Sequence, residues 1–331
     1  MTTLHHAQKD GKKFLNPVPT ILTPPGGFFK ILRQYISNKA EVVPKQPLPH
    51  FKTDTSIYQT PPVSGLRITW IGHSSLLIEI DGYHILTDPV WSERASFVSW
   101  AGPKRFFPPT LPLEELPPLD AVILSHDHYD HLDRATIKKF ANSKTLFYCS
   151  LGVGNHLLKW GIAKNRITEL DWTDSVTIGK DLKLTATPAR HFSGRGIIGR
   201  EQTLWSSFVI KSSKHNIFFG ADSGWFEGFK DIGDAYGPFD LTMLEIGAYG
   251  ENWPNIHMGP INAVNANLAL RGKVMLPIHW GTFNLALHAW REPVERLIPY
   301  AAKNNVTLIL PTPGHPLEVI GEGYNSRWWE K

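Results

Sequence analysis

A run of histidines and aspartates is the part of the sequence best suited to chemistry. It reads Ser125-His126-Asp127-His128-Tyr129-Asp130-His131-Leu132-Asp133 and directly follows the apolar stretch at 121–124. Neutral imidazole nitrogens and carboxylate oxygens both bind borderline divalent metals such as zinc. Chance would place the pattern His-x-His-x-Asp-His in only about 0.001 chains of this composition. The spacing therefore predicts a metal-binding loop at the end of a strand.

Single polar residues follow three later strand-like stretches in the same way. They are His191 after 182–186, Asp222 inside a glycine-flanked turn after 216–219, and His279 after 274–278. One zinc ion takes three or four protein ligands, so four candidates in one loop and three downstream indicate two ions. Zinc is the expected metal, with manganese or iron as alternatives, and the expected ligands are His126, His128, Asp130, His131, His191, Asp222 and His279.

Many short strands are predicted to position these residues, with helices between them. An Asp81-Gly82 pair predicts a tight hairpin turn between two of the strands. Helices are expected near 28–37, over 134–140, from Pro260 to Gly272 and from Pro293 onward. The expected strands are 67–71, 75–80, 83–87, 121–124, 145–149, 182–186, 204–210, 216–219, 241–245, 274–278 and 307–310.

Composition describes an ordinary globular chain of 331 residues, 42% hydrophobic and 19% charged. Residues 1–64, rich in proline and lysine, are predicted to form an extended arm packed on one main domain at 65–331. The net charge of +4 is too small to indicate nucleic acid as a partner. The single cysteine, Cys149, falls in an apolar strand and is expected to be an inert core thiol.

The N-terminal stretch lacks the apolar core of a signal peptide, and no run of about 18 apolar residues predicts a membrane span. A cytoplasmic protein is expected, with peripheral membrane contact left open and the oligomeric state unpredicted. Several tryptophans permit two interpretations. Either they line an apolar entrance for a lipid, or they pack the N-terminal arm onto the domain; they are Trp91, Trp100, Trp253 and the Trp328-Trp329 pair.

Taken together, the ligand pattern over about residues 66–320 resembles the metallo-β-lactamase superfamily. The likeness is closer to the branch of N-acyl-phosphatidylethanolamine-hydrolysing phospholipase D and its bacterial relatives. It is carried by Trp70-Ile71-Gly72-His73-Ser74, Leu86-Thr87-Asp88-Pro89-Val90, Pro103-Lys104-Arg105-Phe106, His191-Phe192-Ser193-Gly194-Arg195, Gly237-Pro238-Phe239-Asp240-Leu241, Ile246-Gly247-Ala248-Tyr249 and Ile278-His279-Trp280-Gly281-Thr282-Phe283.

The resemblance implies an α/β fold, a four-layer αββα sandwich with a dinuclear metal site at one edge of its two sheets. His126, His128 and His191 would bind the first ion, and Asp130, His131 and His279 the second. Asp222 would bridge the two ions. Asp88 and His73 would lie behind these ligands, with Asp88 orienting the histidine loop.

The implied activity is that of a phosphodiesterase of phospholipase D type, acting on N-acyl-phosphatidylethanolamine-like or related phosphodiesters. A metal-bound hydroxide would attack phosphorus, with Asp130 accepting a hydrogen bond from it. His257 is the candidate for contacting the phosphoryl group or protonating the leaving alcohol. Further substrate contacts are expected from Tyr249, Trp253 and Arg195. The chain departs from the branch pattern at 250–253 and 258–262, where the substrate pocket is expected.

Two alternatives share the same residues. A lactonase or another carbonyl-ester hydrolase of this fold would use the same ions on carbon instead of phosphorus. A non-catalytic metal-bound scaffold is the second alternative, which a missing ligand would favour. A true β-lactamase is disfavoured because Asp222 stands where some members carry a cysteine ligand, while Cys149 lies elsewhere.

Overall fold

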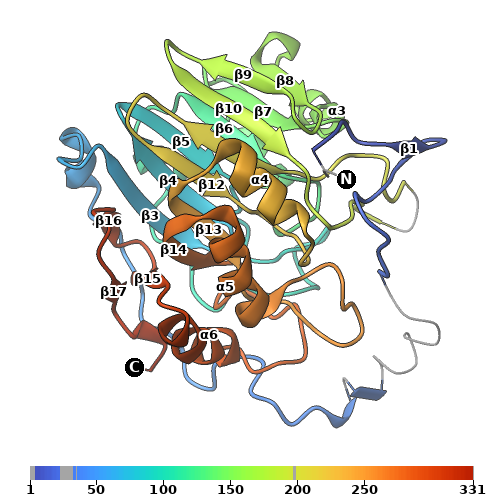
Figure 1. Ribbon diagram of the computed structural model, residues 1–331, viewed down its shortest axis with the longest axis vertical. Coiled ribbons are helices and arrows are strands. Elements are labelled where there is room, and N and C mark those ends of the chain that lie inside the picture. The colour runs from blue at the N-terminus through green and yellow to red at the C-terminus, as the bar shows by residue number, and fades with distance from the viewer. Residues whose placement is uncertain (1–3, 23–32, 35, 197–198, 331) are drawn as a thin grey trace.

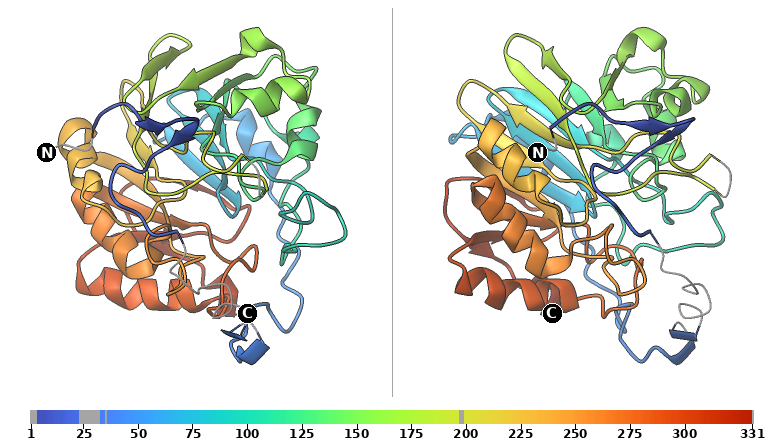
Figure 2. Two further views of the ribbon diagram at one scale, coloured as in Figure 1. Left: turned by 90° about the vertical axis from the view of Figure 1, so that its right-hand side faces the viewer. Right: turned by 45° about the vertical axis from the view of Figure 1, so that its right-hand side comes forward.

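Two mixed β-sheets pack face to face and carry helices on both outer faces (Figures 1 and 2). The computed structural model describes residues 4–22, 33–34, 36–196 and 199–330. In these residues the layer order is helix, sheet, sheet, helix. The four-layer αββα sandwich expected from the resemblance is confirmed.

The first sheet has seven strands in the order β16-β3-β4-β5-β6-β7-β8. An antiparallel meander of β3, β4 and β5 continues into the parallel strands β6 to β8. Alternate side chains face opposite ways: Ile78 points to the second sheet, whereas Leu77 packs under the outer helices. The bounds are β3 Leu66–Gly72, β4 Ser75–Ile80, β5 Tyr83–Thr87, β6 Ala121–Leu124, β7 Leu146–Ser150, β8 Ile167–Leu170 and β16 Pro316–Glu318, with outer helices α2 Arg134–Lys139 and α3 Gly154–Lys159.

The second sheet has eight strands in the order β17-β15-β14-β13-β12-β11-β10-β9. Strands β9 to β12 pair antiparallel, and β12 to β15 and β17 pair in parallel. The bounds are β9 Ser175–Ile178, β10 Leu182–Thr187, β11 Ser207–Lys211, β12 Asn216–Phe219, β13 Phe239–Glu245, β14 Gly272–Ile278, β15 Thr307–Leu310 and β17 Tyr324–Asn325, with outer helices α4 Gly228–Tyr236, α5 Gly259–Leu270 and α6 Glu292–Lys303.

Most of the predicted elements are present within a residue or two of their expected bounds. The Asp81-Gly82 turn is confirmed: both residues have positive φ, 46° and 90°, and Ile80 pairs with Tyr83. The strand expected at 204–210 begins only at Ser207, because Leu204 and Trp205 leave the sheet to pack with Phe14. The helix expected near 28–37 lies mostly outside the described residues.

The described part of the N-terminal arm lies on the main domain at two places. Near its start the arm forms a small hairpin of β1 Lys9–Asp10 and β2 Lys13–Phe14, and Phe14 at the end of β2 is buried beside Trp205. Further on, Phe51 packs edge-on against Trp328 with ring centroids 5.4 Å apart. The remaining elements are short 3-10 turns: Thr55–Gln59, Leu113–Glu115, Lys164–Arg166 and Trp328–Glu330.

The tryptophans divide between the two interpretations. Trp328 and Trp329 are only 1% and 2% exposed, so the lipid-entrance interpretation is wrong for this pair, which packs in the core. Trp91 is half-buried and donates its Nε1–H to the Leu111 carbonyl. Trp100 is 79% exposed. None of the described helices is long and apolar enough to cross a membrane.

Candidate metal centre

The histidine loop leaves the carboxyl end of β6 and is fixed at both ends. At its far end the Asp133 carboxylate accepts from the Ala135 N–H and the Thr136 hydroxyl, and it thereby caps α2. Leu132 and Ile137 are fully buried on either side of the cap. Because the loop is held by a helix cap and two core side chains, its imidazoles are presented in one direction.

Polar residues that follow other strands of both sheets lie at the same edge of the sandwich as the histidine loop. His73, Asp88, Asp222 and His279 follow β3, β5, β12 and β14, and His191 follows β10. Carboxyl ends of parallel strands meet at one edge of a sheet, where sites of α/β proteins assemble. The structure therefore brings all seven expected ligands together.

The first ligand cluster contains His126, His128, His191 and Asp222. His128 Nδ1 lies 2.8 Å from His126 Nε2 and 3.2 Å from His191 Nε2. Burial lowers the pKa of all three histidines, that of His128 to about 4, so the rings are neutral at pH 7. Converging lone pairs of three neutral imidazoles fit a cation between them.

The second ligand cluster contains Asp130, His131 and His279, with His73 beside Asp130. His131 Nε2 and His279 Nε2 lie 3.4 and 3.3 Å from Asp130 Oδ2. The same two nitrogens lie 3.2 and 3.1 Å from Asp222 Oδ2. Bonds of about 2.0–2.1 Å in a tetrahedral zinc site would hold ligand atoms roughly 3.3–3.4 Å apart. The spacing suits a divalent ion, and Asp222 belongs to both clusters.

Buried polar atoms that make no hydrogen bond point to the same conclusion. They include Asp222 Oδ1, His131 Nε2 and His279 Nε2, although the two nitrogens lie 3.2 and 3.1 Å from Asp222 Oδ2. A buried polar atom without a hydrogen bond costs about 1–3 kcal/mol. Bound cations would satisfy these three atoms.

In the second cluster the carboxylates raise the pKa values of the histidines, and the histidines lower the pKa of Asp222. Burial favours neutral His279, but the Asp222 and Asp130 carboxylates outweigh it and raise the pKa of His279 to about 10. The same carboxylates raise the pKa of His131 well above its usual range against the effect of burial. Burial likewise opposes charge on Asp222, but His131 and His279 hold the pKa of Asp222 well below its usual range. Without metal, these groups form buried imidazolium–carboxylate pairs.

Supporting residues fix which nitrogen of each ring faces the centre. Asp88 is fully buried, and its Oδ2 lies 2.7 Å from His131 Nδ1 and accepts from the Ser125 hydroxyl at 2.6 Å. His73 Nε2 lies 2.8 Å from Asp130 Oδ2. The structure thus places Asp88 and His73 directly behind ligands, where such contacts orient a ring and raise its basicity.

Two further supports come from residues that the sequence patterns did not reveal. Glu245 ends β13, is fully buried, and binds His257 Nδ1 at 2.6 Å through Oε2. Its other oxygen accepts from the backbone N–H groups of Ser223 and Met258. On the arm, Asn16 accepts from the His191 N–H at 2.9 Å and donates to the His191 carbonyl at 2.7 Å.

The expected substrate contacts have different positions. His257 and Trp253 line a cleft of about 270 Å³ over the ligands, together with Arg200. Arg195 instead donates to the carbonyls of Asp127 and Leu132 and covers the Tyr129 ring at 4.0 Å, so it supports the histidine loop from behind. Tyr249 lines a neighbouring hollow beside His257.

Comparisons with known proteins give the family. Residues 83–280, more than half of the chain, match the model of the Beta-lactamase superfamily domain. An uncharacterised protein of Mycobacterium tuberculosis is 47% identical over 270 residues, which cover 80% of this chain and 72% of the relative. The N-acyl-phosphatidylethanolamine-hydrolyzing phospholipase D 1 of Caenorhabditis elegans is 38% identical over 246 residues, which cover 71% of this chain and 69% of the relative.

Solved structures share the fold. The metallo hydrolase Igni18 of Ignicoccus hospitalis aligns with a TM-score of 0.59 and 22% identity over 76% of this chain and 97% of its own. An isothiocyanate hydrolase from Delia radicum gut bacteria aligns with a TM-score of 0.62 and 20% identity over 76% and 99%. Fold and ligand clusters define the class, a metal-dependent hydrolase. The chain belongs to the metallo-β-lactamase superfamily, and its relatives include N-acyl-phosphatidylethanolamine-hydrolysing phospholipases D.

Proposed function

We propose that this hydrolase is a dinuclear phosphodiesterase of phospholipase D type that acts on glycerophosphodiesters. The observation that carries the proposal is the pair of ligand clusters joined at Asp222, with His257 held by Glu245 at their margin. The chain is 38% identical to an N-acyl-phosphatidylethanolamine-hydrolyzing phospholipase D. This identity supports hydrolysis of a phosphodiester, with attack at phosphorus, over hydrolysis of a carbonyl ester, with attack at carbon.

Two divalent ions, zinc being the best match to histidine and carboxylate ligands, would supply activated water and neutralise phosphoryl charge. His126, His128 and His191 would hold one ion, Asp130, His131 and His279 the other, and Asp222 both. His73 and Asp88 keep Asp130 and His131 in place.

The residue that handles the leaving group is His257. Glu245 occupies its Nδ1, so Nε2 is the nitrogen available to a substrate. A proton given from Nε2 to the departing alcohol oxygen assists cleavage by about 10²- to 10⁴-fold. The apolar side chains of the cleft, Leu22, Phe192, Ile256 and Leu285, accept the lipid part of the substrate.

Access from a lipid surface is part of the proposal. Phe97 and Trp100 are each 79% exposed on one loop, and the Phe97 ring lies 6.3 Å from that of Tyr129 in the histidine loop. Two exposed aromatic rings beside the site suit contact with a micelle or bilayer.

A hydrolysis screen with the metal-replete protein tests the proposal. Phosphodiesters, glycerophospholipids and lactones are offered at equal concentration, and the products are identified by mass spectrometry. We expect a phosphomonoester and a free alcohol from glycerophospholipids, with little lactone opening. Rapid lactone opening without release of any phosphomonoester would assign the protein to the carbonyl-ester hydrolases instead.

A further inference from the structure

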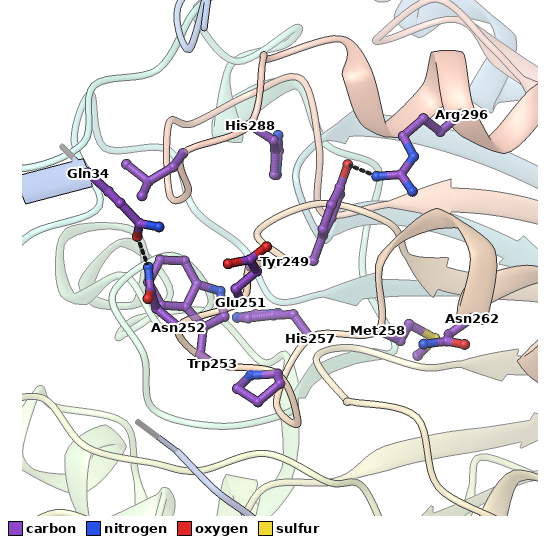
Figure 3. A pocket seen from close by; sticks show the side chains of 13 residues that line it. Gln34, Tyr249, Glu251, Asn252, Trp253, His257, Met258, Asn262, His288 and Arg296 are labelled. Carbon is purple, nitrogen blue, oxygen red and sulfur yellow. Dashed lines mark hydrogen bonds between the residues drawn. The ribbon is translucent and has the colours of Figure 1, made fainter. Parts of the chain in front are cut away.

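A second hollow opens beside the metal cleft and shares a wall with it. It has a volume of about 470 Å³, compared with about 270 Å³ for the cleft, and Trp253 and His257 line both. Figure 3 shows this hollow from close by, with His257 in the middle of its lining residues. We call it the polar pocket.

The two cavities differ in their chemistry. Beyond the candidate ligands, the metal cleft is lined mainly by aliphatic and aromatic side chains. The polar pocket instead presents hydroxyl, amide, imidazole, guanidinium and carboxylate groups, which come from Tyr249, Asn252, Asn262, His288, Arg296 and Glu251. A pocket with converging polar groups selects a ligand that can hydrogen-bond to them.

The polar wall is fixed before any ligand arrives. The Tyr249 hydroxyl donates to Glu292 Oε1 at 2.7 Å, and Arg296 Nη1 lies 3.3 Å from both of these oxygens. The Tyr249 ring stacks on His288 with centroids 4.5 Å apart. These contacts tie the wall to α6, which reduces the ordering cost of binding.

His257 stands where the two cavities meet. An alcohol oxygen hydrogen-bonded to His257 Nε2 lies within about 3 Å of it, so the rest of the alcohol can extend into either cavity. Trp253, the other shared wall, donates its Nε1–H to the Ala248 carbonyl and is thereby held in place. The chemistry of the two cavities decides between them, because the polar pocket suits an alcohol with hydrogen-bonding groups and the cleft suits the lipid remainder.

We infer that the polar pocket receives the departing alcohol, and that this alcohol is small and rich in hydroxyl or amide groups, as glycerol is. The inference rests on the proposed function. A long N-acyl chain in this position would strip water from the Asn262 amide without replacing its hydrogen bonds, at about 1–3 kcal/mol. The lipid remainder of the diester occupies the cleft lined by Phe192 and Leu285.

The reaction consumes one water molecule. The water oxygen bonds to phosphorus, and the bond from phosphorus to the alcohol oxygen breaks. That oxygen leaves with a proton from His257, which regains one from the water, and the other water proton stays on the phosphomonoester. No oxidant or further reactant is needed.

Two diesters that share one phosphatidyl group test the inference. Phosphatidylglycerol releases glycerol, whereas N-acyl-phosphatidylethanolamine releases a long-chain amide alcohol; both are presented in the same detergent micelles to the metal-replete protein. We expect kcat/KM to be at least about tenfold higher for phosphatidylglycerol. Equal values, or a preference for the N-acyl diester, would overturn the inference and leave the proposed function standing. Hydrolysis of neither diester would overturn both.

A matched pair of asparagine substitutions locates the preference. Asn262→Leu removes an amide from the polar pocket, and Asn155→Leu makes the same change on α3, at an exposed residue that does not line it. We expect Asn262→Leu to reduce the ratio of the two kcat/KM values about tenfold, and Asn155→Leu to leave the ratio unchanged. Tyr249→Phe, which keeps the ring, provides a second variant. An unchanged ratio in Asn262→Leu and Tyr249→Phe, with metal content as in the wild type, would contradict the inference.

Discussion

The two edges of the sandwich differ in whether their buried polar side chains are hydrogen-bonded to one another. At the edge opposite the metal centre, the Asp81 carboxylate accepts from the Ser212 hydroxyl and lies 3.0 Å from His215 Nδ1. Asp81 turns between strands of one sheet, and Ser212 and His215 turn between strands of the other. This cluster, which we call the far staple, joins the sheets with side chains that satisfy one another.

At the metal edge several non-glycine residues have positive φ, and several buried polar atoms make no hydrogen bond. His73, Asp88, Ala221, Ala248 and His279 all have positive φ, between 34° and 61°. Such conformations in non-glycine residues cost roughly 1–3 kcal/mol each, and buried nitrogens there make no hydrogen bond. The far staple has one such residue, Asp81 with φ 46°, but its side chains are hydrogen-bonded to one another. Unmet hydrogen bonds therefore gather at the edge where a ligand is expected. The four predictions below separate these two kinds of edge.

The largest effect is expected from Asp222→Ala, because Asp222 belongs to the first ligand cluster and its Oδ2 lies 3.2 and 3.1 Å from His131 Nε2 and His279 Nε2 of the second. Metal content should fall from about two ions per chain to one or fewer, with activity reduced at least about 10³-fold. Elemental analysis after dialysis against zinc measures the first effect. Retention of two ions in this variant would remove Asp222 from its bridging position. His191→Ala is the comparison, and it should mainly weaken the first ion.

The second prediction concerns protons. His131 and His279 hold protons when metal is absent, since both have raised pKa values, that of His279 about 10. Metal binding at pH 7 should therefore release about two protons, and affinity should weaken as pH falls, by roughly 100-fold per pH unit for two protons. Titration calorimetry in buffers of different ionisation enthalpy counts them. Affinity independent of pH between 6 and 8 would contradict this coupling.

An intermediate effect is expected from Asn16→Ala, which removes both hydrogen bonds to the His191 backbone. Affinity for one of the two ions should fall about tenfold, as when other supports of a ligand are removed. Chelator competition provides the measurement. Asn38→Ala is the matched control, because this arm asparagine bonds to the Leu287 carbonyl instead. Equal metal loss in both variants would mean that the arm acts only through overall stability.

The smallest effect on metal is expected at the far staple. Burial alone would raise the pKa of Asp81, but hydrogen bonds from Ser212 and His215 outweigh it and lower that pKa. A lowered pKa stabilises the fold above the ordinary carboxyl value of about 3.9 and loses that contribution as pH falls below it. Asp81→Asn should therefore cost about 1–2 kcal/mol of unfolding free energy at pH 7, and less near pH 3. Denaturant titrations measure this, and metal content should stay unchanged.

Local patterns explain how much of this was predictable. The strands are buried runs of apolar residues, and the ligands either crowd one loop or follow such runs, so both are visible in short stretches. Glu245 and Asn16 carry no such mark. In the sequence Glu245 is an acidic residue at the end of a strand like many others, and only the fold brings it into contact with His257. Asn16 lies 175 residues from its partner His191.

Residues with plausible local chemistry can also be placed wrongly for the same reason. Arg195 follows a ligand segment and suits a phosphate contact, yet its guanidinium is bound to the carbonyls of Asp127 and Leu132. Strands β8 and β9 were missed because they are short and partly exposed, with polar residues that give no clear alternation. Their place at the sheet edges depends on neighbours that are remote in sequence.

The contact between Asn16 and His191 has a consequence for the order of events during synthesis. At roughly 5–20 residues per second, a ribosome needs about 9–35 s to add the 175 residues that separate the two. The arm therefore leaves the ribosome long before its docking surface exists, and it waits as unattached chain. Phe14, which ends buried beside Trp205, is exposed for that interval. A segment made before the rest of the domain is thus among the last to find its place.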